Sequence, residues 1–64
     1  MIGYLARDKN GDLYLHNEKP ELDYELQAYY SNKYDSISNN LFPEFAKITY
    51  ENSPIKVKFD IELV

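Results

Sequence analysis

The fold is decided by residues 2–17, which read IGYLARDKNGDLYLHN. Apolar and aromatic residues flank a central Asn10-Gly11, and these two residue types accept the positive φ angles that a tight hairpin turn requires. The segment therefore predicts a β-hairpin that reverses at Asn10-Gly11. Because the chain has 64 residues, we expect this hairpin to belong to a single small domain spanning residues 1–64.

Two pairing registers are possible for this hairpin. A two-residue loop pairs Ala6 with Leu15, whereas a three-residue loop with a bulge at Gly11 pairs Ala6 with Tyr14. A shift of one residue moves every side chain to the other face, so the register that gathers the apolar residues should be preferred. We therefore expect the two-residue loop, whose buried face consists of Tyr4, Ala6, Leu13 and Leu15 and whose polar face consists of Leu5, Arg7, Tyr14 and His16.

The C-terminal third shows the clearest alternation. Apolar residues at every second position of residues 55–63 alternate with charged ones, which is typical of a half-buried strand. Residues 46–50 alternate in the same way, and Glu51-Asn52-Ser53-Pro54 supplies turn residues between the two segments. This pattern predicts a second hairpin.

The middle of the chain fits less regular patterns. Pro20 should end the second strand, and we expect residues 17–25 to form a solvated connector. Residues 22–34 have apolar spacing that suits a helix, but the tyrosines favour a short strand over residues 26–30, followed by a turn. We prefer the strand.

The next segment predicts irregular structure. Residues 36–40 have the composition of a loop, and residues 39–42 can form one short helical turn stopped by Pro43. Together, the patterns predict a mainly β fold, with an α+β fold left open. We expect an antiparallel sheet or small barrel of four to five short strands from two hairpins, with at most one short helix.

The composition limits what stabilises so small a domain. The chain has no cysteine and one histidine, so neither a disulfide nor a structural zinc site is expected. It has seven tyrosines and three phenylalanines, which leaves an aromatic core or self-association as the means of stabilisation. The regular strand predicted over residues 55–63 would allow a homodimer if it lies at a sheet edge.

The charge argues against several classes of partner. Eleven acidic residues against seven basic ones give a net charge of −4, which disfavours nucleic acid and anionic membranes. A nucleic-acid regulator of small-barrel type, the alternative hypothesis, would need a basic patch from Lys33, Lys47, Lys56 and Lys58. No signal peptide and no transmembrane stretch are visible in the sequence, so we expect a cytoplasmic protein without a membrane partner.

One motif resembles a metal site. Asp8, Asn10 and Asp12 match the first, third and fifth ligands of a calcium loop, but the sixth and twelfth positions hold Leu13 and Lys19 instead of glycine and glutamate. We therefore interpret the motif as turn chemistry and expect no metal.

Catalytic groupings are not visible either. His16 is expected to be a surface histidine on the polar face of its strand. The serines have no identifiable base, and Gly3 and Gly11 are too few for a phosphate loop. We expect a protein that is not an enzyme and has no cofactor.

Tyrosine is concentrated in the acidic middle of the chain. Tyrosine is enriched at interfaces because its ring is apolar while its hydroxyl remains hydrated. The alternative is that these side chains form the core of a domain without tryptophan, and we prefer the core. If they are exposed, the partner-binding residues are Tyr24, Tyr29, Tyr30 and Tyr34.

Two blocks of sequence lie toward the ends of the chain. One combines residues 4–8 (YLARD), Gly11, residues 13–15 (LYL) and Lys19-Pro20, and the other combines residues 41–44 (LFPE) and 49–57 (TYENSPIKV). Together they resemble a group of small uncharacterised proteins from gut bacteria and their phages. In the similar sequences the middle often carries tryptophan where this chain has Tyr29-Tyr30.

The resemblance implies a short free-standing protein of mobile-element origin. It does not indicate an activity, because the similar proteins are uncharacterised. The small size, the absence of catalytic groupings and the surplus of tyrosine lead to the main functional hypothesis, beside the nucleic-acid alternative given above. We expect a non-enzymatic interaction protein that binds a protein partner or itself.

Overall fold

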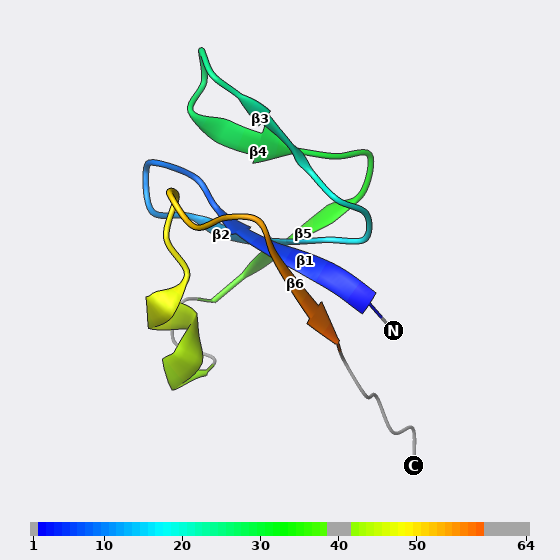
Figure 1. The fold of residues 1–64 in the computed structure, drawn as a ribbon, viewed down its shortest axis with the longest axis vertical. Helices are drawn as coiled ribbons and strands as arrows, with labels where there is room; N and C mark the ends of the chain where they lie inside the picture. Colours follow the sequence, from blue (N-terminus) through cyan, green and yellow to red (C-terminus); the bar gives the residue numbers. More distant parts are fainter. Residues whose placement is uncertain (1, 39–41, 59–64) are drawn as a thin grey trace.

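The computed structural model describes residues 2–38 and 42–58, and these form an antiparallel, mainly β fold (Figure 1). Four strands form one open sheet in the order β5-β2-β1-β6, and β3 and β4 form a separate two-stranded hairpin. This confirms the predicted fold class, as a sheet that does not close into a barrel. The elements are β1 (Ile2–Arg7), β2 (Leu13–His16), β3 (Glu21–Asp23), β4 (Ala28–Tyr30), β5 (Tyr34–Ile37), the 3₁₀ helix η1 (Pro43–Lys47) and β6 (Ile55–Lys58).

The N-terminal hairpin is confirmed, but the preferred register is wrong. Leu5 pairs with Leu15 and Ala6 pairs with Tyr14, as in the three-residue loop. Gly11 has a φ of 100°, and its backbone N–H donates to the carbonyl of Asp8 at 2.9 Å. The loop is therefore a turn followed by a glycine bulge, a conformation that favours glycine at this position.

Both faces of the sheet are covered, and this explains the wrong register. Leu5 and Leu13 are 1% exposed on one face, while Ala6 and His16 are fully buried on the other. The β3–β4 hairpin lies over the second face and contacts β1 (Figure 1). A division into one apolar and one polar face therefore does not apply, and the predicted buried set (Tyr4, Ala6, Leu13 and Leu15) mixes residues from both faces.

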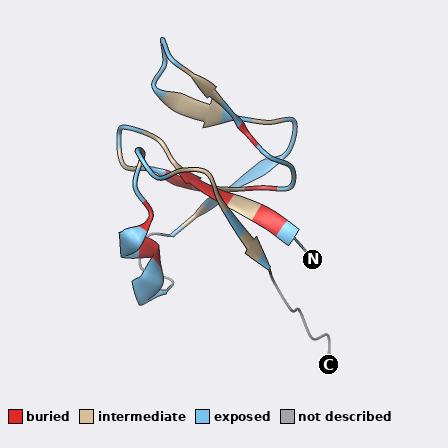
Figure 2. Cartoon of the chain, in the orientation of Figure 1, coloured by how far each residue is buried: buried red, intermediate tan, exposed pale blue. Residues whose placement is uncertain are grey.

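The hydrophobic core lies on the face opposite the β3–β4 hairpin. Its buried members come from β1, β2 and the η1 segment (Figure 2). Phe45 in η1 and Ile48 directly after it are 8% and 6% exposed, so the η1 segment, residues 43–48, acts as the apolar cover of this face. The core consists of Leu5, Leu13, Phe45 and Ile48, with Leu15, Ile37, Ile55 and Val57 packed against it.

Arg7 attaches the η1 segment to the sheet. Its guanidinium donates hydrogen bonds to the carbonyls of Phe45 at 2.8 Å, Gly11 at 2.7 Å and Ile48. The carbonyl of Phe45 also accepts the backbone N–H of Ile48, so Arg7 adds a second donor there and binds two further carbonyls, one just after the 3₁₀ helix and one in the turn. Arg7 was predicted on a polar face. It does share the face of Leu5, as predicted, but this is the core face, where its guanidinium satisfies backbone acceptors.

The predicted second hairpin is wrong. Residues 43–47 form a 3₁₀ helix instead of a strand, because Pro43 fixes a helical φ at its first position and the N–H of Ile48 bonds to the carbonyl of Phe45. Strand β6 therefore pairs with β1, with Ile55 opposite Leu5. Residues 59–63 of the predicted strand lie outside the described residues.

The middle of the chain contains more strand than predicted. The preferred strand over residues 26–30 is confirmed as β4, although Leu26 and Gln27 lie in the turn before it. The expected connector includes β3, and the expected loop at residues 36–38 includes the end of β5, where Ile37 pairs with Leu13 at the core. Pro43 begins a helical turn instead of stopping one, and residues 39–41 lie outside the described residues.

Candidate functional site

The tip of the β3–β4 hairpin exposes two large side chains. Tyr24 and Leu26 are 82% and 75% exposed. The turn that carries them is held by Asp23, whose Oδ1 accepts the backbone N–H groups of Glu25 at 3.0 Å and Leu26 at 3.1 Å. Gln27 follows with a φ of 53°, so the chain reverses within residues 24–27. The tip is a short turn with internal hydrogen bonds, which presents apolar surface to solvent.

The hairpin is anchored to two loops of the rest of the molecule. The N–H of Lys9 donates to the carbonyl of Gln27 at 3.0 Å, and the N–H of Tyr29 donates to Oδ1 of Asp8 at 2.9 Å. The Tyr29 hydroxyl reaches the other loop, where its single proton is shared between the carbonyls of Tyr50 at 3.0 Å and Ser53 at 2.8 Å. Burial raises the pKa of this phenol, which therefore remains a neutral donor.

The four tyrosines predicted to bind a partner have different surroundings. Tyr24 and Tyr30 lie on the hairpin and are exposed, while Tyr29 is the half-buried anchor between them. Tyr34 lies on β5, 56% exposed, with its ring edge-on to Tyr14 at 5.6 Å. The preferred interpretation as core is therefore wrong for Tyr24, Tyr30 and Tyr34.

Tyr30 is fixed at the base of the hairpin. Its hydroxyl donates to Oε2 of Glu21 at 2.8 Å, across the strand pair. This hydrogen bond to a carboxylate, together with its negative charge, raises the pKa of Tyr30. The interaction orients both side chains at the surface.

Leu26 is the residue of this surface that the sequence did not identify. Its only signal is its place three residues after Asp23, in an Asx-type turn that exposes the residue at this position. In the sequence Leu26 fitted an apolar helical spacing, which suggested burial instead.

His16 was predicted at the surface, and this is wrong. The side chain is fully buried beneath the hairpin, and its Nδ1 lies 2.7 Å from Oγ of Ser31. Oγ of Ser31 also donates its single proton to the carbonyl of Lys33 at 3.0 Å, so Nδ1 of His16 is the donor to Ser31. Nε2 is then unprotonated, and it has no hydrogen-bond partner among the described residues.

This arrangement determines what His16 and Ser31 can do chemically. Because Ser31 directs its proton away from the ring, the imidazole does not activate the hydroxyl as a nucleophile. Desolvation lowers the pKa of His16, with a smaller opposing effect from the charge of Asp8. The pair therefore serves to hold the loop after β4 against β2.

The residues that resemble calcium ligands are engaged in the first turn. Oδ1 of Asn10 accepts the N–H of Asp12 at 2.9 Å, while Asp8 binds the backbone of Tyr29. In the part of the chain that the structure describes, no group of three or more His, Cys, Asp or Glu side chains is placed to hold a metal ion.

The four lysines needed for a nucleic-acid surface are dispersed. Lys56 and Lys58 lie on edge strand β6, and Lys33 precedes β5 at the opposite edge of the sheet. Three inter-strand spacings, about 14 Å, separate these edges. Lys47 ends η1 on the core side, so the four side chains do not form a continuous basic patch.

No protein-family model, curated protein or solved structure matches this chain. Over residues 2–38 and 42–58, no helix is long and apolar enough to cross a membrane.

Proposed function

We propose that this chain is a non-enzymatic protein-binding domain whose contact surface is the β3–β4 hairpin. The observation that carries the proposal is the exposure of Tyr24 and Leu26, at 82% and 75%, on a turn whose backbone is held in place. Apolar side chains this exposed contribute little to folding. A partner that covers them gains the free energy of removing this apolar surface from water.

The anchoring of the hairpin supports this use. Ordering a loop during binding costs free energy, and a loop that is already fixed avoids that cost. Here the contacts of Lys9 and Tyr29 fix the hairpin on the side facing the sheet. The tip is therefore presented in one conformation.

The charge of the hairpin favours another protein over a second copy of this chain. Residues 20–30 contain Glu21, Asp23 and Glu25 and no basic residue. A symmetric contact between two hairpins would bring these like charges together, which disfavours the dimer.

The test is a comparison of captured proteins. The tagged full chain, the Tyr24→Ser/Leu26→Ser variant and the Ile2→Ser variant are each incubated with a lysate of the source organism, and retained proteins are quantified by mass spectrometry. Ile2 is a suitable control because it is 52% exposed but lies on β1, away from the hairpin.

We expect at least one protein to be retained by the wild type and by Ile2→Ser and to be reduced about tenfold or more by the tip variant, as for a binding hot spot. The proposal is wrong if all three chains retain the same proteins equally, or if none retains more than the tag alone.

A further inference from the structure

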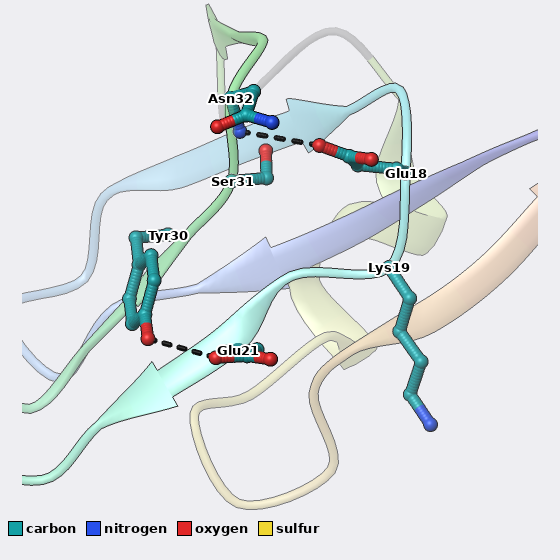
Figure 3. A pocket seen from close by; sticks show the side chains of 6 residues that line it. All are labelled: Glu18, Lys19, Glu21, Tyr30, Ser31 and Asn32. Atoms are coloured by element: carbon teal, nitrogen blue, oxygen red, sulfur yellow. Dashed lines mark hydrogen bonds between the residues drawn. The ribbon is translucent and has the colours of Figure 1, made fainter.

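A hollow of about 290 Å³ lies beside the base of the β3–β4 hairpin (Figure 3). Glu21 and Tyr30, which begin β3 and end β4, form part of its wall. The tip residue Tyr24 lies three residues further along, about 10 Å at the rise of a strand. One partner surface can therefore contact both the tip and the hollow. The hollow is lined by Glu18, Lys19, Glu21, Tyr30, Ser31 and Asn32.

Two carboxylates of this lining are oriented but incompletely bonded. Oε2 of Glu21 accepts from the Tyr30 hydroxyl at 2.8 Å, and Oε1 of Glu18 accepts from the backbone N–H of Asn32 at 3.4 Å. The other oxygen of each carboxylate has no hydrogen bond to a described residue. The hollow therefore offers free acceptors on both glutamates, and the Glu21 carboxylate is oriented by the Tyr30 hydroxyl.

The chain itself does not neutralise these carboxylates. Among residues 2–38 and 42–58, neither Glu18 nor Glu21 forms an ion pair. Lys19 is the nearest cation in sequence, but Figure 3 shows its side chain extending away from both glutamates. Residues 18–25 carry four acidic side chains against this one lysine, so the local charge favours a positive ligand.

We propose that this hollow receives an arginine side chain of the protein that binds the hairpin. The inference rests on the proposed function, and it adds the chemistry of the partner. A guanidinium supplies five donors in one plane, which suits carboxylate oxygens on more than one side. Its flat face also stacks on an aromatic ring, here that of Tyr30. An arginine therefore matches this lining better than a lysine, whose ammonium is a compact point charge.

The hollow can be tested without the partner. The probe is N-acetyl-arginine amide, titrated into the ¹⁵N-labelled full chain while amide chemical shifts are recorded. The control probe is N-acetyl-citrulline amide, which has the same shape but no charge. We expect the arginine probe to shift the amides of Glu18, Tyr30, Ser31 and Asn32 with roughly millimolar affinity, and the citrulline probe to leave them unchanged.

Three outcomes would overturn the inference. They are equal shifts with both probes, shifts outside these residues only, and no shift at saturating probe. A calcium titration serves as a further arm, because a divalent cation that shifts the same amides more strongly than the arginine probe would assign the carboxylates to metal binding instead.

Variants separate this inference from the proposed function. Glu18→Gln/Glu21→Gln removes both charges of the hollow, and Asp35→Asn/Glu44→Gln removes two exposed charges elsewhere, so that the net charge changes equally. We expect the first pair to weaken retention of the captured partner about tenfold and the second pair to leave it unchanged.

If the partner is lost with Tyr24→Ser/Leu26→Ser but retained fully with Glu18→Gln/Glu21→Gln, the protein-binding function holds and the arginine site is wrong. If the tip variant retains the partner fully, the proposed function itself is wrong. In that case the arginine titration alone decides whether the hollow binds a cation.

Discussion

The two coverings of the central sheet differ in chemistry. The η1 segment covers one face with apolar side chains, Phe45 and Ile48, packed on Leu5 and Leu13. The β3–β4 hairpin covers the other face over His16, through polar contacts and tyrosine hydroxyls. Apolar packing supplies stability without fixed direction, whereas hydrogen bonds fix the orientation of what they hold. The first covering therefore stabilises the fold, and the second positions a surface.

The largest expected effect is on the apolar side. Leu13→Ala removes a side chain that is 1% exposed, and we expect the free energy of unfolding to fall by about 3 kcal/mol because a cavity remains. Leu26→Ala makes the same chemical change at a 75% exposed position and should alter it by less than about 0.5 kcal/mol. Urea unfolding of both variants measures the difference. Equal losses would contradict the assignment of stability to the η1 side.

The next largest effect is a pH dependence of stability that arises from His16, beneath the β3–β4 hairpin. Burial lowers the pKa of His16 in the folded chain below its ordinary 6.5, so between the two values the unfolded chain binds more protons. Stability is therefore fully present above about pH 6.5 and is lost as pH falls from there toward the folded pKa. The facing groups are Ser31 and Tyr34, with Tyr4 opposite His16 on β1 and Asp8 contributing a smaller opposing charge.

His16→Leu isolates this contribution. Thermal unfolding midpoints at pH 8 and pH 5 should differ more for the wild type than for the variant, because only the wild type must release a proton from His16 when it folds at pH 5. The same pH dependence in both chains would show that His16 is not the responsible group.

A smaller effect is expected at the anchor of the hairpin. Tyr29→Phe removes the hydroxyl that binds the carbonyls of Tyr50 and Ser53, and we expect a loss of about 1 kcal/mol. Hydrogen exchange of the β4 amides should accelerate more than that of β2. Tyr24→Phe provides the matched control at an exposed position. If both variants exchange like the wild type, the hydroxyl does not anchor the hairpin.

The smallest effect on stability is expected at the tip. Tyr24→Ser/Leu26→Ser should change the free energy of unfolding by less than about 0.5 kcal/mol, because both side chains are already exposed. Calorimetry measures this directly. A much larger loss would mean that the tip contributes to folding, and the difference between the two coverings would then be smaller than proposed.

The sequence predicted the reversal at Asn10-Gly11 and the strand β4, because both depend on neighbouring residues. It did not predict which distant strands pair. The bulge at Gly11 and the two-residue turn share the same Asn10-Gly11 signal, and only the burial of both faces selects the bulge. The alternation at residues 46–50 suggested a strand. However, the position of Pro43 and the attachment of the segment by Arg7 determine a 3₁₀ helix.

The candidate site was predicted only in part, because the burial of each side chain depends on which distant segments pack together. Tyrosine enrichment identified Tyr24 and Tyr30, but composition cannot distinguish an exposed tyrosine from an anchor such as Tyr29. Leu26 was missed because an apolar residue normally indicates burial. His16 was misplaced because its cover, the β3–β4 hairpin, was not expected over that face.

The central claim is that the hairpin tip, and not the sheet, contacts a partner. The most direct measurement replaces Tyr24 with p-benzoylphenylalanine and, in a second chain, places the same photo-cross-linker at exposed Thr49 beside η1. After irradiation in a lysate of the source organism, we predict a discrete cross-linked protein from position 24 and none from position 49. No adduct at position 24, or the same adduct from both positions, would contradict the account.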